Sequence, residues 1–322
     1  MVRFLKKIVA ISLALLVLSA CSTTSKSQST ADPDAKHIGI LQYVEHPSLS
    51  ASREGFIDEL AKEGYVDGQN IVIDYKNAQG DQSNLQAISE KLIRQNDLVL
   101  GIATTAAQSL ASLSTETPIL FTDVTDPISA SLVKTMKQPG GIATGTSDMT
   151  PIKKQVELLQ EVLPDIKTVG IMYTTSERNS EVQVEEAKKR FKQAGIKTIV
   201  KGISSTNDVQ DTAKSLMSKS EALFIPTDNT IVSSINLVTA LSKEMKIPVI
   251  GGSADVVEQG VLFTYGADYE SLGRQTAKMA IKLLNGAKPS ELPAEYPADV
   301  NVVVNKEMAK ELGIDLSAIT SK

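Results

Sequence analysis

The sequence predicts an α/β protein made of two lobes, each a doubly wound parallel sheet. From residue 36 onward, short β-branched runs alternate with stretches of helical spacing. This alternation is typical of a parallel sheet that is covered on both faces. The alternation restarts near residues 142–151, so the second half of the chain repeats the plan of the first. The length of 322 residues also favours two domains over one.

The N-terminus has the features of a targeting segment. Three basic residues within the first seven positions precede an apolar run at 8–18, which is too short to span a bilayer comfortably. We therefore expect residues 1–20 to be a signal peptide that is removed. Residues 21–35 are polar and without periodicity, so we expect them to form a flexible tether.

Cys21 is the only cysteine of the chain. It cannot close an internal disulfide, which leaves a buried filler, a reactive thiol or an attachment point. The preceding Leu18, Ser19 and Ala20 resemble the lipobox of bacterial lipoproteins, in which the cysteine receives a diacylglyceryl group. The resemblance implies lipid attachment at Cys21 and a mature protein on the extracytoplasmic face of the cell membrane. The alternatives are a transmembrane anchor or a signal peptide with an incidental cysteine.

The first half is expected to hold four strands with helices between them. One helix carries Phe56, Ile57 and Leu60 on a single face, with charged residues elsewhere. Another is expected at 129–136, where Asp126, placed before a proline, is expected to cap the helix. The strands are expected at 37–44, 71–78, 97–103 and 118–124.

The second half is expected to hold four further strands, each followed by a helix such as 180–195. These strands are expected at 168–174, 197–203, 222–228 and 248–253. Two later pieces, 261–268 with the helix after it and 300–305 with a final helix, are expected to cross back between the lobes. Lobe 1 is therefore expected to comprise 36–147 plus about 266–290, and lobe 2 148–265 plus about 295–322.

We expect a hinge at Thr146 to Asp148, because the alternation restarts there and Gly145 lies beside it. Hinge closure brings two lobes together around a ligand.

Composition excludes several classes of function. The two histidines, His37 and His46, cannot make a spaced zinc cluster or supply a Ser/His/Asp site. No glycine-rich dinucleotide fingerprint follows Tyr43. The net charge of -5 argues against nucleic acid, which requires a basic face. We therefore expect no catalytic residues, no metal, no cofactor and no nucleic-acid partner.

The loops at the carboxyl ends of the strands are the expected binding surface. In parallel α/β sheets, ligands bind at these ends beside the N-termini of helices. Two facing lobes make a cleft between such loops, and corresponding loops of the two halves face each other. The paired loops are YVEHPS with YTTSERNS, IATTAA with FIPTDNT, and FTDVTDP with GGSADV.

Several segments resemble one family of substrate-binding subunits of ABC importers. They include GILQYVEHPSLSASREGF, NAQGD, GIATTAAQSLA, FTDVTDPISASLV and GRQTAKMAIKLLNGAKP, and the resemblance covers nearly all of the chain after residue 36. Better-understood members bind aromatic amino acids, tryptophan among them. The resemblance implies a periplasmic-binding-protein type I fold and a monomeric lipoprotein. Such a protein captures an amino acid and delivers it to a permease with its ATPase subunit.

An amino acid presents a carboxylate beside an ammonium, so its site needs donors next to acceptors. Backbone amides around Thr104, Thr105 and Ala106 open an expected helix and provide donors, backed by the helix dipole. Thr125 and Ser147 add hydroxyl groups. The alternative is that Thr104 or Thr105 only caps its helix.

Asp228 is the expected acceptor for the ammonium, because it ends a strand in the half opposite the carboxylate site. Asp123 and Asp255 are the other candidates. For Asp228 and Asp255, the competing interpretation is a helix cap.

The remaining candidate contacts are on the first loop pair and beside Asp228. His46 is either a lid over the ligand or a turn residue, and Asn179 and Ser180 are either contacts or helix caps. Glu45 and Asn229 complete the expected site.

Three other functions compete with amino-acid binding. An enzyme would need a nucleophile and base, which do not accompany the carboxylates. A ligand-sensing regulator would need a DNA-binding segment where this chain has a signal and lipobox. A sugar-binding subunit is the nearest alternative, although the chain has no tryptophan to stack on a sugar.

Overall fold

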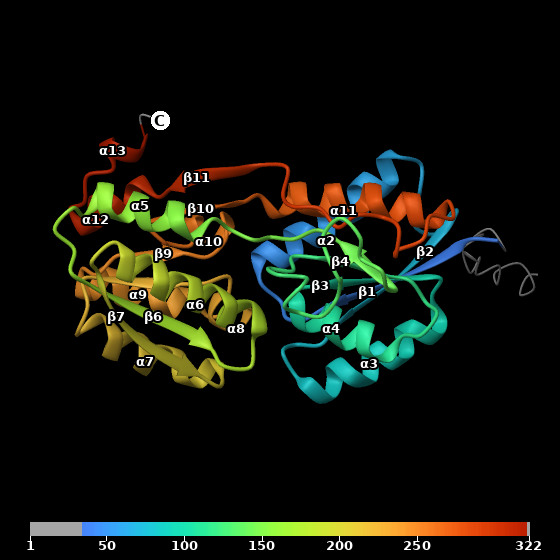
Figure 1. Cartoon of the computed structure of the whole chain (residues 1–322), viewed down its shortest axis with the longest axis horizontal. Coiled ribbons are helices and arrows are strands. Elements are labelled where there is room, and N and C mark those ends of the chain that lie inside the picture. Colours follow the sequence, from blue (N-terminus) through green and yellow to red (C-terminus); the bar gives the residue numbers. More distant parts are fainter. Residues whose placement is uncertain (1–33, 321–322) are drawn as a thin grey trace, which may run out of the picture.

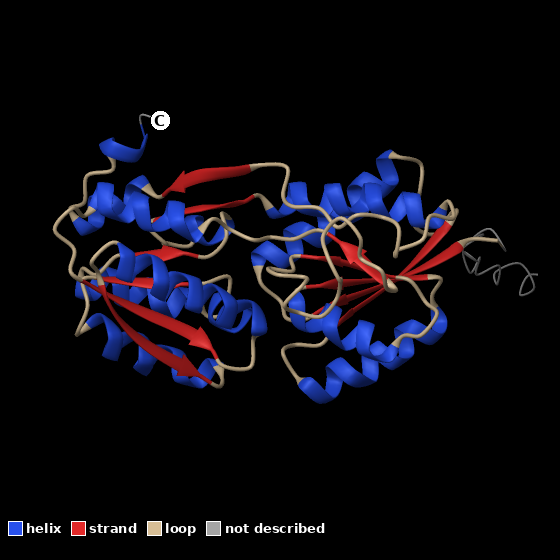
Figure 2. Ribbon diagram, in the orientation of Figure 1, coloured by secondary structure: helices blue, strands red, loops and turns tan. Residues whose placement is uncertain are grey.

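The computed structural model describes residues 34–320, which form two α/β lobes lying side by side (Figure 1). In each lobe, helices cover both faces of a sheet (Figure 2). Within these residues, neighbouring strands run parallel to each other, except the last two, which are antiparallel. The predicted fold class is therefore confirmed. The predicted signal peptide, Cys21 and all but the end of the tether lie outside the described residues.

Lobe 1 is built on a five-stranded sheet in the order β2-β1-β3-β4-β5. Its central strand β3 is buried along its whole length, whereas the edge strand β2 is half-buried after its first residue. A continuous apolar run is what a strand with helices on both faces requires. The strands are β1 (Lys36–Gln42), β2 (Ile71–Asn77), β3 (Leu98–Ile102), β4 (Ile119–Thr122) and β5 (Ala143–Gly145).

Two pairs of helices cover the sheet of lobe 1. α3 (Gln82–Gln95) packs beside α4 (Thr104–Leu113), and α2 (Pro47–Lys62) packs against α11 (Tyr269–Leu284). α11 lies far along the chain, yet it makes the most extensive helix contact of the lobe. A Cβ atom on Gly273 of α11 would lie 1.9 Å from the backbone oxygen of Ser52, so glycine is what allows the two helices to approach so closely.

Lobe 2 is built on a six-stranded sheet in the order β11-β10-β9-β8-β6-β7. The strand β11 at one edge runs antiparallel to β10. β8 is buried along its whole length. The strands are β6 (Thr168–Thr174), β7 (Lys197–Ile203), β8 (Ala222–Ile225), β9 (Val249–Gly251), β10 (Phe263–Ala267) and β11 (Val300–Val304).

Helices form two layers over this second sheet. α5 and α6 pack together over a core in which the rings of Phe191 and Phe224 meet edge to face at 5.9 Å. α7 and α9 pack together over the other core. The helices are α5 (Ile152–Val162), α6 (Arg178–Gln193), α7 (Val209–Met217), α8 (Asn229–Val232), α9 (Ile235–Met245), α10 (Asp255–Glu258), α12 (Lys306–Leu312) and α13 (Ser317–Thr320), with a 3-10 turn at Thr206–Asp208.

The helix expected at 129–136 is not formed, and this prediction was wrong. Residues 127–136 make a series of turns instead. Ser131 adopts a φ of 61°, which interrupts the right-handed conformation that a helix needs. The Asp126 side chain still accepts the backbone N–H groups of Ile128 and Ser129, both at 3.1 Å, but it caps a turn rather than a helix.

The chain passes between the lobes three times within the described residues. It does so at 146–151 after β5, at Asp268 before α11, and at 285–299 before β11. Two of these crossings run beside each other, because Thr146 and Glu295 form a parallel bridge and the Ser147 amide donates to the Glu295 carbonyl at 2.8 Å.

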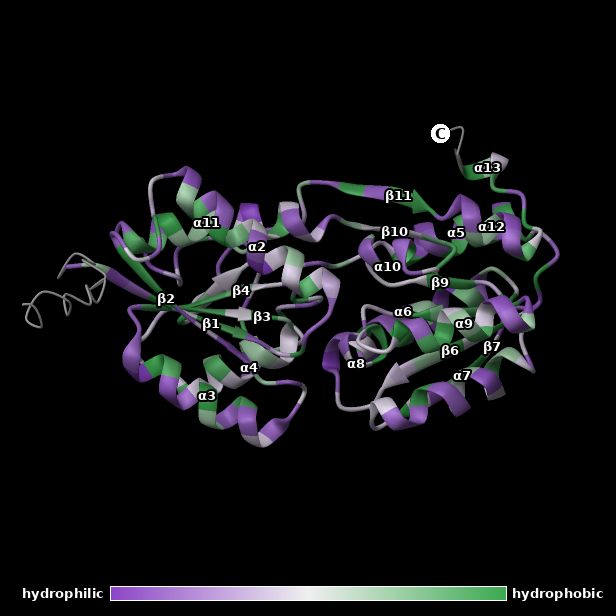
Figure 3. Ribbon diagram, turned by 180° about the vertical axis from the view of Figure 1, so that it is seen from behind, coloured by the Kyte–Doolittle hydropathy of each residue, from purple (hydrophilic) through white to green (hydrophobic). Residues whose placement is uncertain are grey.

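The distribution of hydropathy agrees with this layered arrangement. The central strands are hydrophobic and the helices carry hydrophilic residues on their outer faces (Figure 3). Of the helices in the described part of the chain, none is both long and apolar enough to cross a membrane.

Candidate functional site

Loops at the carboxyl ends of both sheets enclose a small cavity between the lobes. The cavity has a volume of about 10 Å³. That is room for roughly one water molecule, so the lobes are closed against each other. The cavity is lined by His46, Asp123, Thr125, Asp148, Asn179, Thr227, Asp228, Asn229, Val232, Ser253 and Tyr269.

Side-chain pairs join the two lobes directly around this cavity. Each pair combines a residue that follows a strand of lobe 1 with one that follows a strand of lobe 2. The loops meet across the cavity, but these bonds do not join the predicted pairs. YVEHPS reaches FIPTDNT and GGSADV, and FTDVTDP reaches FIPTDNT, so the expectation that corresponding loops face each other was wrong for these contacts. The pairs are His46 with Asn229, Ser48 with Ser253, and Thr125 with Thr227, at 3.2, 2.9 and 3.4 Å.

Asp123 is held in an unusual conformation directly after β4. Its φ of 58° is rare for a residue with a side chain, and such strain is often found at functional sites. Oδ1 accepts hydrogen bonds from Ser52 and Thr122 at 2.8 and 3.0 Å, whereas the buried Oδ2 has no hydrogen-bond partner. Burial and the charge of nearby Asp148 raise the pKa of Asp123 well above its usual range. This carboxyl therefore lacks a positive partner.

Asp148 is a second buried carboxyl on the same cavity. Its Oδ2 accepts a 2.6 Å hydrogen bond from the hydroxyl of Tyr269, at the start of α11. Its Oδ1 is buried without such a bond. Burial raises the pKa of Asp148, although the hydrogen bond from Tyr269 acts in the opposite direction. A cation between Asp123 and Asp148 would stabilise the charged forms of both.

The hydrogen bonds around His46 define its tautomer. The Asn229 side chain donates through Nδ2 to Glu177 at 2.7 Å, so its Oδ1 faces His46 as an acceptor. His46 Nε2 therefore carries the proton, which leaves Nδ1 as a buried acceptor without a partner. Burial lowers the pKa of His46 to about 4, despite opposing effects of Asn229 and Glu45. The ring is therefore neutral near pH 7.

Asn179 adds a fourth acceptor to the cavity. Its Nδ2 donates to the Thr227 carbonyl at 2.7 Å and to Glu177 at 3.0 Å, so its buried and unpartnered Oδ1 is the acceptor. The unpartnered side-chain atoms that line the cavity are thus all acceptors, two of them on carboxyl groups. Among its described lining residues there is no lysine or arginine. The arrangement suits a ligand group with several donors and a positive charge.

Asp228 also lines the cavity, but the protein itself satisfies both of its oxygens. Oδ1 accepts from the Thr174 hydroxyl and the Ile231 amide, and Oδ2 accepts from the Thr174 amide and the Ser180 hydroxyl, at 2.6 to 2.9 Å. The bond from Ile231 makes Asp228 the N-terminal cap of α8. Burial and the charge of Glu177 raise the pKa of Asp228 to about 7.

Thr104, Thr105 and Ala106, at the start of α4, are not among the residues that line the cavity. β3 and β4 are neighbours in the sheet, so Thr104 and Asp123 follow adjacent strands. No side chain caps α4, and the buried hydroxyl of Thr104 makes no hydrogen bond. The capping role considered for Thr104 and Thr105 is therefore not observed. Thr105 faces a separate groove between α3 and α4, and Ala106 is buried.

Three predicted site residues support others instead of lining the cavity. The Ser147 hydroxyl donates to the Thr125 carbonyl at 2.9 Å, and Ser180 donates to Asp228 at 2.7 Å. Ser180 and Asn179 lie inside the first turn of α6, whose N-cap residue is Glu177, so neither has the capping position considered for it. Glu45 forms its hydrogen bonds within lobe 1.

Five lining residues were not predicted as ligand contacts. Thr227 adjoins Asp228, and Ser253 lies in a loop already expected to face the cleft, so both followed from the loop alignment. Asp148 was expected to be part of the hinge. Val232 and Tyr269 had no local signal, because tertiary packing alone brings them to the cavity. These five residues are Asp148, Thr227, Val232, Ser253 and Tyr269.

Metal binding has no support within residues 34–320. No three His, Cys, Asp or Glu side chains in that part of the chain are grouped so that they could hold a metal ion.

Comparison with known proteins identifies related chains of similar length. A tyrosine-binding protein of Clostridioides difficile is 39% identical over 298 residues, which cover 90% of this chain and 86% of that protein. An ABC domain from Streptococcus pneumonia, solved in complex with L-Trp, is 42% identical with a TM-score of 0.85, covering 88% of this chain and 96% of that one.

A third relative, solved in an open form, allows the arrangement of the two lobes to be compared. The ligand-free, open structure of a substrate-binding protein with adhesive properties from Clostridium difficile is 43% identical, over 87% of this chain and 96% of that one, but has a TM-score of only 0.67. At similar identity, the lobe arrangement is therefore nearer to that of the L-Trp complex. The family model of the ABC transporter substrate binding protein matches residues 37–321. The chain belongs to this family of ABC transporter substrate-binding proteins.

Proposed function

We propose that this protein captures an aromatic α-amino acid between its lobes and delivers it to the permease of an ABC importer. The relatives described as tyrosine-binding and as bound to L-Trp, at 39% and 42% identity, support an aromatic ligand. The observation that carries the proposal is the set of unpartnered acceptors on the cavity: His46 Nδ1, Asp123 Oδ2, Asp148 Oδ1 and Asn179 Oδ1.

The ammonium of the ligand binds at these acceptors. An ammonium has three donors and a positive charge, which match the unpartnered oxygens of Asp123 and Asp148. Asp123 is the principal partner, because its pKa is raised by burial and by Asp148, and an adjacent cation would relieve both effects. Asp228 keeps a structural role, since four protein donors already occupy it.

The carboxylate of the ligand binds at the start of α4. The uncapped amides of Thr104, Thr105 and Ala106 are available as donors, and the positive end of the helix dipole lies behind them. The unpartnered hydroxyl of Thr104 adds a further donor. Since β3 and β4 are adjacent strands, this position neighbours Asp123, as the spacing of an α-amino acid requires.

Entry of the ligand requires the lobes to open. The closed cavity has room for roughly one water molecule, far less than an amino acid needs. Opening occurs at the three crossings, including the segment Thr146 to Asp148, by rotation of one lobe against the other.

The protein acts as a monomer on the extracytoplasmic face of the cell membrane, anchored by a lipid on Cys21. The permease and its ATPase subunit are its partners. It binds and releases its ligand without chemical change, which its membership of the substrate-binding protein family supports.

Binding of L-tryptophan, L-tyrosine, L-leucine and myo-inositol to the purified protein tests this proposal. The chain has no tryptophan, so the change in fluorescence of L-tryptophan on binding is followed without emission from protein tryptophan, and calorimetry measures the other three. Tight binding of an aromatic amino acid with weak binding of leucine supports the proposal. Preferential binding of the polyol, or release of a sugar from the denatured protein as identified by mass spectrometry, contradicts it.

A further inference from the structure

The segment 43–48, which follows β1, provides the lobe 1 side chain in two of the three hydrogen-bonded pairs described above that join the lobes. His46 reaches Asn229 and Ser48 reaches Ser253. Tyr43 is also buried against lobe 2, where Glu177 and Asp228 add to the effect of burial in raising its pKa to about 12. We call residues 43–48 the closing segment. Its position decides whether these contacts form together.

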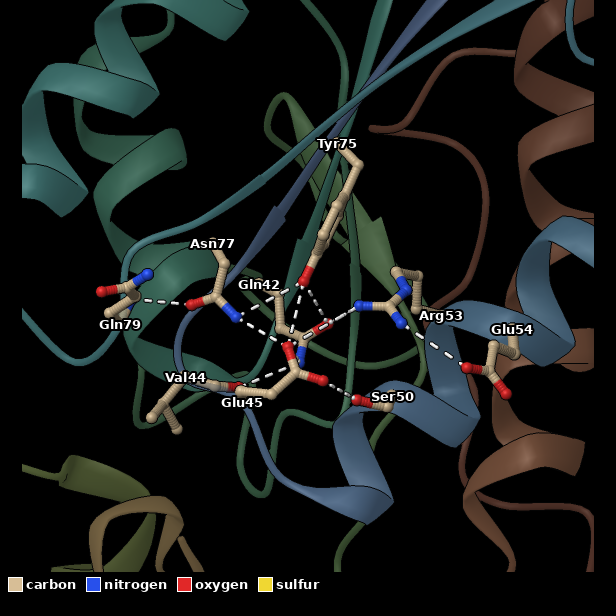
Figure 4. A network of polar contacts seen from close by, with 9 residues as sticks. All are labelled: Gln42, Val44, Glu45, Ser50, Arg53, Glu54, Tyr75, Asn77 and Gln79. Atoms are coloured by element: carbon tan, nitrogen blue, oxygen red, sulfur yellow. Dashed lines mark hydrogen bonds and ion pairs between the residues drawn. The ribbon is translucent and has the colours of Figure 1, made fainter.

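Glu45, in the middle of the closing segment, directs its carboxylate toward Ser50 and Asn77 of lobe 1 (Figure 4) and does not line the cavity. Its Oε1 accepts a hydrogen bond from Ser50 at 2.5 Å. Its Oε2 accepts from Asn77 at 2.9 Å and from Gln42 at 3.3 Å. These donors come from α2, β2 and β1, so one carboxylate connects the closing segment to three elements.

Arg53 and Tyr75 complete this network. The Arg53 guanidinium lies 4.4 Å above the ring of Tyr75, donates to Gln42 Oε1 at 2.9 Å and lies 3.9 Å from Glu45 Oε2. The side-chain Nε2 of Gln42 donates to the backbone carbonyl of Val44, inside the closing segment, at 2.9 Å. The network is therefore anchored on an aromatic ring of β2 and ends on the backbone beside His46.

We propose that Glu45 is a positioning residue for ligand capture, which holds the closing segment so that His46 is placed both for the ligand and for Asn229 of the opposite lobe. This inference rests on the proposed function. Glu45 does not itself touch the ligand, because its carboxylate is directed into lobe 1. It acts through His46.

An ionised carboxylate is what this position requires. The hydrogen bond from Ser50 and the charge of Arg53 outweigh burial and lower the pKa of Glu45. In Glu45→Gln, the amide oxygen can keep the bonds from Asn77 and Gln42 while the NH₂ group faces Ser50, whose hydroxyl can turn to accept it. The substitution therefore keeps the size of the side chain and removes the negative charge that lies 3.9 Å from Arg53.

The first test compares Glu45→Gln with Glu54→Gln. Glu54 is a matched control, because it pairs with the same Arg53 at 3.5 Å but lies on α2, outside the closing segment. We expect Glu45→Gln to weaken binding of L-tryptophan and L-tyrosine roughly tenfold, as is typical for loss of coupling between neighbouring residues. Glu54→Gln should change binding less than about twofold. Equal effects of the two variants would overturn the inference.

A double-mutant cycle then asks whether Glu45 acts through His46. In a His46→Ala background, Glu45→Gln should cost much less than it does alone, since the residue that it positions is gone. A cost that is the same in both backgrounds would mean that Glu45 acts independently of His46, and would overturn the inference.

Nitrogen NMR of the histidines provides a readout that does not require binding. His37 and His46 are the only histidines, and His37 lies at the start of β1, so it serves as an internal reference. Glu45→Gln should shift the His46 signals and leave those of His37 unchanged, whereas Glu54→Gln should shift neither. If the wild-type protein binds no amino acid, the proposed function fails and this spectrum alone decides the inference. Unshifted His46 signals would overturn it.

Discussion

Asp228 accepts hydrogen bonds from both the backbone amide and the hydroxyl of Thr174, at 2.6 and 2.8 Å. These bonds tie the start of α8 to the end of β6, two elements separated by more than fifty residues. With the capping bond to the Ile231 amide, each carboxylate oxygen accepts one backbone N–H group. The geometry is that of a structural carboxylate.

Asp228→Asn is therefore expected to destabilise the fold. Wherever the amide nitrogen is placed, it faces a backbone N–H, of Thr174 or of Ile231. An unsatisfied buried donor costs about 1–3 kcal/mol in the free energy of unfolding, which lowers the melting temperature by roughly 2–4 °C per kcal/mol. Thermal unfolding measures this change. Asp126→Asn is the control, because only Oδ1 of Asp126 accepts backbone N–H groups. An unchanged melting temperature with lost binding would instead assign the ammonium to Asp228.

Asp123→Asn is expected to weaken ligand binding without destabilising the fold. The asparagine oxygen can keep the hydrogen bonds of Ser52 and Thr122, while its NH₂ group takes the position of the unpartnered Oδ2. Loss of one member of a buried charged pair costs about 2–5 kcal/mol in binding, so Kd should rise roughly thirtyfold or more. The melting temperature of the free protein should stay the same or rise, since a buried charge is removed. Calorimetry that finds normal affinity would transfer the ammonium to another acceptor.

Ligand affinity is expected to fall as the pH is lowered from 7.5 to 5. The closed form holds the pKa of His46 at about 4, below the usual value of about 6.5. Closure must therefore release a proton from His46 whenever the pH is below about 6.5, and at pH 5 this weakens binding by up to about thirtyfold.

The variant His46→Gln separates the contribution of His46 to the pH dependence of ligand affinity from the contribution of the cavity carboxyls. The glutamine keeps a donor for Asn229 but does not titrate. Asp123 and Asp148 must lose protons to bind an ammonium, so they act in the same direction and remain in the variant. Calorimetry across this pH range should show a shallower dependence for His46→Gln. An identical dependence would contradict the assignment of the proton to His46.

Gly273→Ala is expected to separate α11 from α2. The new Cβ would lie 1.9 Å from the Ser52 carbonyl, and an overpacked contact costs typically about 1–3 kcal/mol. Because Ser52 also donates to Asp123, binding should weaken together with stability. Gly141→Ala is the control, since its Cβ would have no neighbour within 4 Å. Chemical denaturation and ligand titration of both variants test this expectation, and similar results for the two would refute it.

Cys21→Ala is expected to release the protein from the membrane. If a lipid on Cys21 is the anchor, the variant should move from the membrane fraction to the soluble extracytoplasmic fraction. Binding of L-tryptophan by the released protein should be unchanged, because lobes 1 and 2 are built from residues beyond the tether. Fractionation followed by immunoblotting measures this, and continued retention in membranes would exclude lipid attachment as the anchor.

The fold was predictable because both sheets are parallel except for the edge strand β11. Buried strands such as β3 and β8 are continuous apolar runs, and helices with one apolar face separate them. The wrong helix at 129–136 shows the limit of this approach. The chain turns at Ser131, whose φ is positive, and Gln108 of α4 donates to the carbonyl of the preceding Ala130, a tertiary contact that local spacing does not reveal.

The sequence could predict which loops lie at the cavity, but not which of their side chains are free to bind a ligand. The alignment of the two halves brought His46, Asp123 and Asn179 to one cavity. A sequence does not reveal which carboxylate is already satisfied, however. Asp123 and Asp228 both follow strands, and only the three-dimensional partners distinguish an unpartnered oxygen from a capped one. Glu45 was expected at the ligand for the same reason.

The placement of α11 in lobe 1 has a consequence for how the chain folds after synthesis. α11 is the cover of α2 and its buried Phe56 and Leu60, yet it is reached only at residue 269. A growing chain that has produced every strand of lobe 1 still lacks this cover, so its apolar helix face stays exposed. The first lobe can be completed only after nearly all of lobe 2 has followed. A polypeptide that threads through a membrane before it folds gains time from such an order, because its first lobe cannot become compact early.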